Sequence, residues 1–259
     1  MTAITGPALG AGLQGRGVLV TGAAGGIGAA VAHCFAETGA RVVLCDLPGT
    51  PLNELLASLP GKGHDAAAFD VLDIDAHHEM ITAADRASGG LVALANLAAV
   101  IRRRHDLVSI SEADWDAQLD VNLKAAFFLN RAFAEHLRLA SRQGSIVNFS
   151  SQGWWTGGYG GSVVYNAAKG GVVSMTRGLA RSYATHGIRV NAVAPGLIDT
   201  PMLRDDMTEE SLARLVDQVP QGRLGVPAEV APSVVFLASD HARYITGATL
   251  NISGGFLMY

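Results

Sequence analysis

The sequence predicts a single α/β domain built on a doubly wound parallel sheet. Short runs of apolar or β-branched residues alternate with longer Ala-rich stretches between residues 17 and 253. The short runs are apolar on both faces, which is typical of parallel strands covered by helices on either side. No linker, internal repeat or low-complexity segment divides the 259 residues. One domain is therefore expected.

The elements follow in order along the chain. Strands are predicted over 17–22, 40–46, 66–71, 91–98, 144–151, 188–196 and 248–253. Helices are predicted over 28–39, 51–61, 111–140, 163–186 and 227–239, and Gly39 closes the first of them. Residues 1–14 lack the basic start and apolar run of a signal peptide and are expected to form a flexible leader before a domain over 15–259.

Composition narrows the class of protein. The formal net charge is -4, and the longest basic run, Arg102–His105, is short, so nucleic acid and acidic membranes are poor partners. No apolar run reaches the ~18 residues of a membrane span. The two cysteines, Cys34 and Cys45, form no CxxC pattern, which favours a reducing compartment. We expect a cytoplasmic protein.

A glycine-rich loop, "TGAAGGIG" (21–28), joins the first strand to the first helix. Gly22 permits a tight turn, and Gly26 and Gly28 allow a pyrophosphate to approach the helix N-terminus closely. Asp46 ends the second strand 18 residues after Gly28. Loop, helix and acid together predict dinucleotide binding.

Asp46 also predicts which dinucleotide is bound. Its carboxylate can accept hydrogen bonds from the adenosine ribose diol and would repel a 2′-phosphate. Leu47 and Pro48 follow it instead of a basic residue. NAD is therefore favoured over NADP. After the third strand, Asp70 and Val71 either bracket the adenine, or Asp70 caps a helix.

A tyrosine and a lysine, Tyr165 and Lys169, are spaced to share one helix face. Hydride transfer to a carbonyl requires a general acid/base beside the nicotinamide. A free phenol has a pKa of about 10, and a nearby ammonium would lower it towards the working pH. A hydroxyl of Ser150 or Ser151, at the end of the fifth strand, could hydrogen-bond the substrate oxygen.

Seven motifs in the sequence resemble those of a known family. In order they are "TGAAGGIG" (21–28), "NLAA" (96–99), "DVNLKAAFF" (120–128), "GSIVNFSS" (144–151), "YNAAK" (165–169), "RVNAVAPGLIDT" (189–200) and "GATLNISGG" (247–255). The chain resembles the short-chain dehydrogenases/reductases of the compact one-domain branch over nearly its whole length. The resemblance implies a Rossmann fold, a small alcohol or ketone substrate, and a homotetramer assembled through the helices over 111–140 and 163–186 and the C-terminal strand.

The resemblance also implies roles for single residues. Tyr165 would be the acid/base, Lys169 would lower its pKa and hold the nicotinamide ribose, Ser151 would orient the substrate, and Asn122 would steady a water. Further cofactor contacts are implied for Ile27, Asn96, Ala98, Pro195, Gly196, Ile198 and Thr200. Two departures stand out. Leu97 and Ala99 replace the family's usual Asn and Gly, and Ser151 lies fourteen residues before the tyrosine instead of thirteen, with Ser150 as the weaker candidate.

The substrate end is less clearly marked. Trp154 and Trp155, in the loop that runs to Tyr159, either wall the substrate pocket or pack against neighbouring helices. Arg102, or another arginine of "VIRRR", either pairs with a substrate carboxylate or is solvated surface. That stretch resembles polyol and sugar-acid dehydrogenases of the family, so we expect a polyol, sugar or sugar acid. The charged segment between Thr200 and Val226 is expected to form a mobile lid.

Other classes of protein fit the sequence less well. No zinc-ligand spacing occurs among the eight histidines, and His77–His78 is expected to start a polar helix, so no metal is predicted. A 3-oxoacyl or other ketone reductase, and a non-catalytic NAD-sensing regulator, remain alternatives. A sugar-nucleotide epimerase would need a second domain, for which too little chain follows Gly196.

Overall fold

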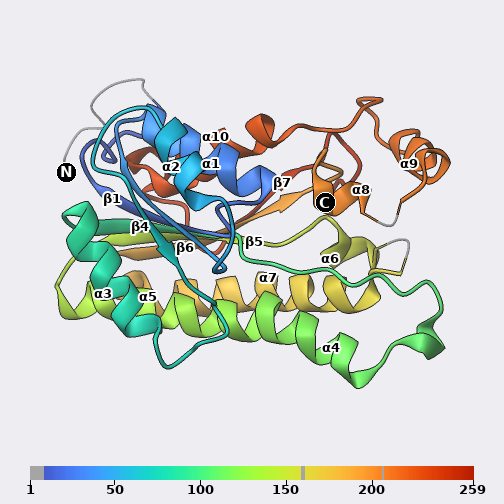
Figure 1. Cartoon of the computed structure of the whole chain (residues 1–259), viewed down its shortest axis with the longest axis horizontal. Helices are drawn as coiled ribbons and strands as arrows, with labels where there is room; N and C mark the ends of the chain where they lie inside the picture. The colour runs from blue at the N-terminus through green and yellow to red at the C-terminus, as the bar shows by residue number, and fades with distance from the viewer. Residues whose placement is uncertain (1–8, 159–160, 206) are drawn as a thin grey trace.

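A seven-stranded parallel sheet forms the centre of the molecule, in the strand order β3-β2-β1-β4-β5-β6-β7 (Figure 1). The structure is a computed structural model that describes residues 9–158, 161–205 and 207–259. The strand order reverses between β1 and β4, as in a doubly wound Rossmann fold. The predicted fold class is confirmed.

The strands occupy the predicted positions, and all except the second end one to three residues before their predicted carboxyl ends. They are β1 (Gly17–Thr21), β2 (Arg41–Asp46), β3 (Asp65–Ala68), β4 (Leu91–Asn96), β5 (Gly144–Phe149), β6 (Ile188–Pro195) and β7 (Thr249–Ile252). Alternate side chains enter different cores: Val18 and Val20 pack on one face of the sheet, and Leu19 packs on the other. This explains why the strands are apolar on both faces.

Helices cover both faces of the sheet (Figure 1). On one face lie α1 (Gly26–Glu37), α2 (Leu52–Ser58) and α10 (Pro227–Ala238). On the other lie α3 (His77–Ser88), α4 (Glu112–Leu119), α5 (Ala126–Leu139) and α7 (Val163–Tyr183). Short 3₁₀ turns occur at Leu107–Ser109, Ala184–His186 and Asp240–Ala242.

The single helix predicted over 111–140 is interrupted. A π-helical segment, Asp120–Ala125, separates α4 from α5. Local sequence gives no sign of it, because Asp120–Ala125 contains neither Gly nor Pro. Such segments often accompany functional sites, and this one carries Asn122.

The leader predicted over 1–14 needs a correction. Residues 1–8 lie outside the described residues, but the segment over 10–14 packs on the domain. The Leu13 side chain is 2% exposed, and the Ala11 carbonyl accepts a hydrogen bond from the Asp240 amide at 2.8 Å. The ordered domain therefore begins before residue 15.

Three short helices lie beyond the carboxyl ends of the strands. They are α6 (Gly153–Thr156), α8 (Pro201–Arg204) and α9 (Glu209–Val216), and they gather at the right of the view in Figure 1. Within the described residues, no helix is both long and apolar enough to span a bilayer. A cavity opens at this carboxyl-end edge of the sheet.

Candidate functional site

A cavity of about 1070 Å³ opens at the carboxyl ends of the strands. Its walls come from the loop after β1, the ends of β2, β4, β5 and β6, the start of α7, and the α8–α9 segment. Ligands bind at this position in doubly wound sheets, where strand order reverses. A cavity of this volume lies at the upper end of the range for small-molecule and cofactor sites.

The glycine loop forms one end of the cavity and has no room for side chains at two positions. Gly22 has φ +65°, and a Cβ added there would lie 2.8 Å from the Ala98 amide nitrogen. A Cβ added at Gly28 would overlap the Gly22 carbonyl oxygen. No side chain caps the start of α1 at Gly25. Backbone N–H groups at a helix start of this kind suit the pyrophosphate of a dinucleotide.

Asp46 lies at the same end and already supports the loop. Its Oδ2 accepts a hydrogen bond from the Ala24 amide at 2.8 Å, and its Oδ1 accepts one from the Leu47 amide at 2.8 Å. Each oxygen keeps a lone pair for a further donor. Among the described residues that line the cavity between positions 22 and 72, none is Lys or Arg. This end of the cavity fits a ribose diol.

Asp70 and Val71 also line the cavity. The Asp70 Oδ1 accepts a hydrogen bond from the Leu72 amide at 2.9 Å, so Asp70 closes a turn. Helix α3 begins only at His77, and the alternative of a helix-capping Asp70 is therefore wrong. Its carboxylate and Val71 remain at the cavity wall.

Three of the four residues from Asn96 to Ala99 line the cavity. Leu97, Ala98 and Ala99 line the cavity, whereas Asn96 does not. The Asn96 Oδ1 accepts a hydrogen bond from the Thr21 hydroxyl at 3.0 Å, and Asn96 is 6% exposed. Asn96 thus ties β4 to β1 behind the cavity wall, which differs from the cofactor contact expected for it.

Tyr165 and Lys169 lie on the first turns of α7 and both line the cavity. The Lys169 Nζ donates a hydrogen bond to the Phe149 carbonyl at 2.8 Å and lies 5.4 Å from the centre of the Tyr165 ring. Burial lowers the pKa of Lys169 to about 7. Burial raises the pKa of the Tyr165 phenol to about 12, and the positive charge of Arg103 opposes that rise.

These shifts correct one expectation. Lys169 was expected to lower the pKa of Tyr165, but in the protein alone burial dominates and the opposing cation is Arg103. Near neutral pH the phenol carries its proton, and desolvation pushes Lys169 towards its neutral form. Tyr165 thus holds the proton that a general acid would transfer, although burial makes the phenol a weaker acid.

The two candidate serines differ in what their hydroxyls do. Ser150 is 3% exposed, and its Oγ donates to the Lys169 carbonyl at 2.9 Å. Ser151 is partly exposed at the cavity wall, and its Oγ accepts a hydrogen bond from the Gly153 amide at 3.2 Å. That bond leaves the Ser151 proton available to a ligand. The geometry supports Ser151 over Ser150.

Asn122 lies in the π-helical segment and is 1% exposed. Its Oδ1 accepts from the Val100 amide at 3.0 Å, and its Nδ2 donates to the Val100 carbonyl at 2.7 Å. The side-chain amide is thus engaged with the segment that follows β4. The structure gives Asn122 a positioning contact with Val100, and the water contact that the resemblance implied stays a prediction.

The segment after β6 places four expected cofactor residues at the cavity: Pro195, Gly196, Ile198 and Thr200. The Thr200 hydroxyl donates to the Ile198 carbonyl at 3.3 Å, and its Oγ1 accepts from the Leu203 amide at 3.3 Å at the start of α8. Ile27 lines the opposite wall. Met207, Ser211 and Leu215 of the expected lid also line the cavity, so the segment covers it.

The expected substrate residues need correction. Trp154 and Trp155 are not among the cavity-lining residues; their ring centres lie 5.4 Å and 6.1 Å from that of Tyr259, in an aromatic cluster near the chain end. Part of their loop, residues 159–160, lies outside the described residues. Arg102 lines the cavity, but its Nη1 lies 3.6 Å from an oxygen of Asp114.

The sequence did not single out Arg103, whose Nη groups donate to the carbonyls of Asp205 and Met202 at 2.8 Å and 3.1 Å. No local signal separates it from its two arginine neighbours, since the difference lies in where Asp114 is. For metals, the described part of the chain contains no group of three or more potential ligands. His77 starts α3 as expected, and its Nε2 contacts the Val71 carbonyl at 2.8 Å.

Comparisons with known proteins agree with this geometry. A family model described as enoyl-(acyl carrier protein) reductase matches residues 22–257. The chain is 39% identical to a 3-oxoacyl-[acyl-carrier-protein] reductase of Thermotoga maritima over 95% of this chain and 99% of that protein.

Two solved structures are also similar. One is a putative short-chain alcohol dehydrogenase of Sinorhizobium meliloti, 37% identical, with a TM-score of 0.87 over 94% of this chain and 97% of that one. The other is a putative 2-deoxy-D-gluconate 3-dehydrogenase of Agrobacterium tumefaciens with bound NADP, 39% identical, with a TM-score of 0.85 over the same shares of 94% and 97%.

Proposed function

The chain belongs to the short-chain dehydrogenase/reductase family, and from this premise we propose that it is an NAD-dependent oxidoreductase of a secondary alcohol and its ketone. One observation carries the proposal: Tyr165, Lys169 and Ser151 line the same cavity as the glycine loop and Asp46. A dinucleotide bound along the loop would place its reactive end beside the phenol. The nicotinamide would supply the acceptor or donor of hydride.

The chain's own residues would handle the proton. In the reducing direction Tyr165 donates its phenolic proton to the oxygen of the carbonyl. Ser151 donates a hydrogen bond to the same oxygen, which stabilises the charge that develops there. In the oxidising direction Tyr165 removes the proton, and the positive charge of Arg103 favours the phenolate. The Phe149 carbonyl fixes the Lys169 Nζ near the ring.

The preference for NAD rests on charge. Asp46 would repel a 2′-phosphate, and no described Lys or Arg lines this end of the cavity to offset it. The Agrobacterium relative holds NADP in its structure, so a similar protein can bind the other cofactor and the preference for NAD must be measured. We expect a kcat/KM for NAD at least ten times that for NADP. Equal values, or a preference for NADP, would overturn this part of the proposal.

For the substrate we propose a polyol, sugar or sugar acid. The Agrobacterium relative is described as a putative 2-deoxy-D-gluconate 3-dehydrogenase, and the polar residues Gln152 and Ser162 at the cavity wall suit hydroxyl groups. Reduction of a 3-oxoacyl thioester is the second candidate, because the Thermotoga relative is named for it. We also propose a cytoplasmic homotetramer, to be tested by light scattering coupled to size exclusion.

The reaction is tested by following NADH absorbance with polyols, sugar acids, hydroxy acids and acyl thioesters. Tyr165→Phe is expected to lower kcat at least 10³-fold on any substrate found, since it removes the proton and keeps the ring. Calorimetric binding of NADH should survive that change. Loss of both turnover and NADH binding would indicate misfolding. Retained turnover would refute the proton transfer assigned to Tyr165. NADH binding without turnover of any compound would favour the regulator.

A further inference from the structure

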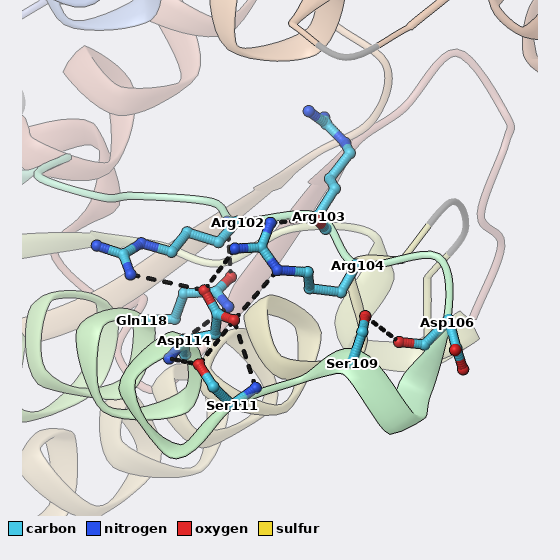
Figure 2. A network of polar contacts seen from close by, with 8 residues as sticks. All are labelled: Arg102, Arg103, Arg104, Asp106, Ser109, Ser111, Asp114 and Gln118. Carbon is cyan, nitrogen blue, oxygen red and sulfur yellow. Dashed lines mark hydrogen bonds and ion pairs between the residues drawn. The ribbon is translucent and has the colours of Figure 1, made fainter.

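Three consecutive arginines follow β4, and among the residues that the structure describes only two of them meet a carboxylate (Figure 2). Asp114 accepts a two-pronged pair from Arg104, at 3.1 Å from Nε and 2.8 Å from Nη2. It also lies 3.6 Å from the Arg102 Nη1. Hydrogen bonds from Ser111, together with Arg104, hold the pKa of Asp114 below its usual value. Asp114 is therefore ionised: it forms a two-pronged ion pair with Arg104 and lies within ion-pair distance of Arg102.

The segment over 100–104 is held by side chains from one face of helix α4 and the π-helical segment after it. Asp114, Gln118 and Asn122 recur every four residues, and each is 5% exposed or less. Gln118 accepts from the Arg102 amide at 3.0 Å, and Asn122 pairs with both backbone groups of Val100. Charge and amide contacts thus fix the segment over 100–104 before any ligand arrives.

This clamp decides where Arg103 points. Arg102 and Arg104 turn to Asp114, and Arg103, between them, turns away from it. Figure 2 shows the Arg103 side chain directed away from the Asp114 cluster. It is half-buried at the cavity wall.

Nothing in the described part of the chain neutralises Arg103. Its guanidinium donates to the carbonyls of Asp205 and Met202, which are dipoles without net charge. Arg214, a cavity-lining arginine in helix α9, already pairs with Glu210 at 2.6 Å. A guanidinium has five N–H donors, so Arg103 keeps donors for a ligand. An uncompensated cation in a cavity attracts an anion.

We propose that Arg103 is a specificity-determining residue that binds a carboxylate of the substrate. The substrate class is then a hydroxy or oxo acid, sugar acids included, whose carboxylate lies close to the reacting carbon. The inference rests on the proposed function and narrows it. Arg103 and Tyr165 line the same cavity, so an anion bound by Arg103 would lie in the cavity that holds the phenol. The phosphates of an acyl-CoA would not, because a pantetheine arm separates them from the thioester.

The test uses pairs of compounds that differ in charge: gluconate with sorbitol, and 3-hydroxybutyrate with its methyl ester. Binding to the NADH-loaded full-length protein is measured by calorimetry, and turnover is measured with NAD. The variants are Arg103→Gln, Arg103→Lys and, as matched control, Arg214→Gln, which removes a cavity arginine that has its own carboxylate.

At least one acid is expected to bind tighter than its neutral partner. Arg103→Gln should weaken that acid about 100-fold in Kd or kcat/KM and its partner less than threefold, with Arg103→Lys between. Arg214→Gln should leave the preference unchanged. Equal losses for acid and neutral partner would overturn the proposal and make Arg103 a lid contact only. So would the absence of any acid preference in the wild type. Turnover of neutral alcohols but not of acids would support the proposed oxidoreductase activity and refute only the role of Arg103.

Discussion

Replacing Lys169 with Met is predicted to stabilise the protein at neutral pH while it abolishes turnover. Lys169 is 3% exposed, and no carboxylate of the described residues lies within ion-pair distance of its Nζ, which is held only by the Phe149 carbonyl at 2.8 Å. Burial lowers its pKa from 10.5 to about 7. At any pH at which the Lys169 amine would be protonated in the unfolded chain, its burial therefore lowers the free energy of unfolding.

The sign and size follow from proton linkage. Because the folded pKa lies below the unfolded one, the unfolded state binds more protons between pH 7 and 10.5, and wild-type stability rises with pH there. At 1.36 kcal/mol for each unit of pKa, the buried lysine costs about 4 kcal/mol at pH 7 and about 2 kcal/mol at pH 9. Methionine removes this cost but leaves the Phe149 carbonyl unpaired, which costs about 1–3 kcal/mol.

Lys169→Met should thus be more stable than the wild type by about 1–3 kcal/mol at pH 7, and the gain should shrink by about 2 kcal/mol at pH 9. Urea unfolding at pH 7, 8 and 9 measures it. Lys62→Met, at an exposed turn, should give a difference that stays constant with pH. A Lys169→Met difference that does not change with pH would refute the reasoning, because all other groups are common to both proteins.

Three further outcomes are expected. Ser151→Ala should lower kcat at least 100-fold with unchanged stability, whereas Ser150→Ala should lose about 1 kcal/mol in urea unfolding and keep kcat within tenfold; the reverse result would move the catalytic role to Ser150. Asn122→Ala should raise the KM of the substrate and lower the free energy of unfolding by about 2 kcal/mol, because Val100 loses both partners; unchanged amide exchange at Val100 would contradict the clamp. Gly28→Ala should weaken calorimetric NADH binding at least tenfold, since the added methyl would overlap the loop backbone; an unchanged Kd would show that the loop can relax.

The sequence predicted the fold well because its signals are local. Each strand is a short apolar run between helices, and such a pattern permits few arrangements other than a doubly wound sheet. Ends of elements were less predictable. The predicted strand over 66–71 ends at Ala68, because the chain turns at Asp70 through its own side chain. The π-helical segment was missed, since the two amide contacts that accompany it come from Val100, twenty-two residues away.

The cofactor end of the candidate site was predictable for a related reason. Gly22 and Gly28 are required by backbone geometry, and backbone requirements are written in the residues themselves. Tyr165 and Lys169 share a helix turn, so their proximity also follows from spacing. The environment of that pair did not follow. Its pKa shifts are dominated by burial, which depends on elements distant in sequence.

The substrate end shows the same limit most clearly. Arg102, Arg103 and Arg104 have identical side chains in adjacent positions, and nothing within the run distinguishes the central one. The distinction is made by Asp114, which lies on a helix ten residues after Arg104 and draws the two outer arginines towards itself. The position of this carboxylate therefore determines which of the three arginines turns away from it. If Asp114→Asn is made, Arg102 and Arg104 lose their charged partner and any preference for acids should no longer depend on Arg103 alone, so that Arg103→Gln costs less in this background than in the wild type. Equal costs in both backgrounds would mean that Asp114 has no part in the choice.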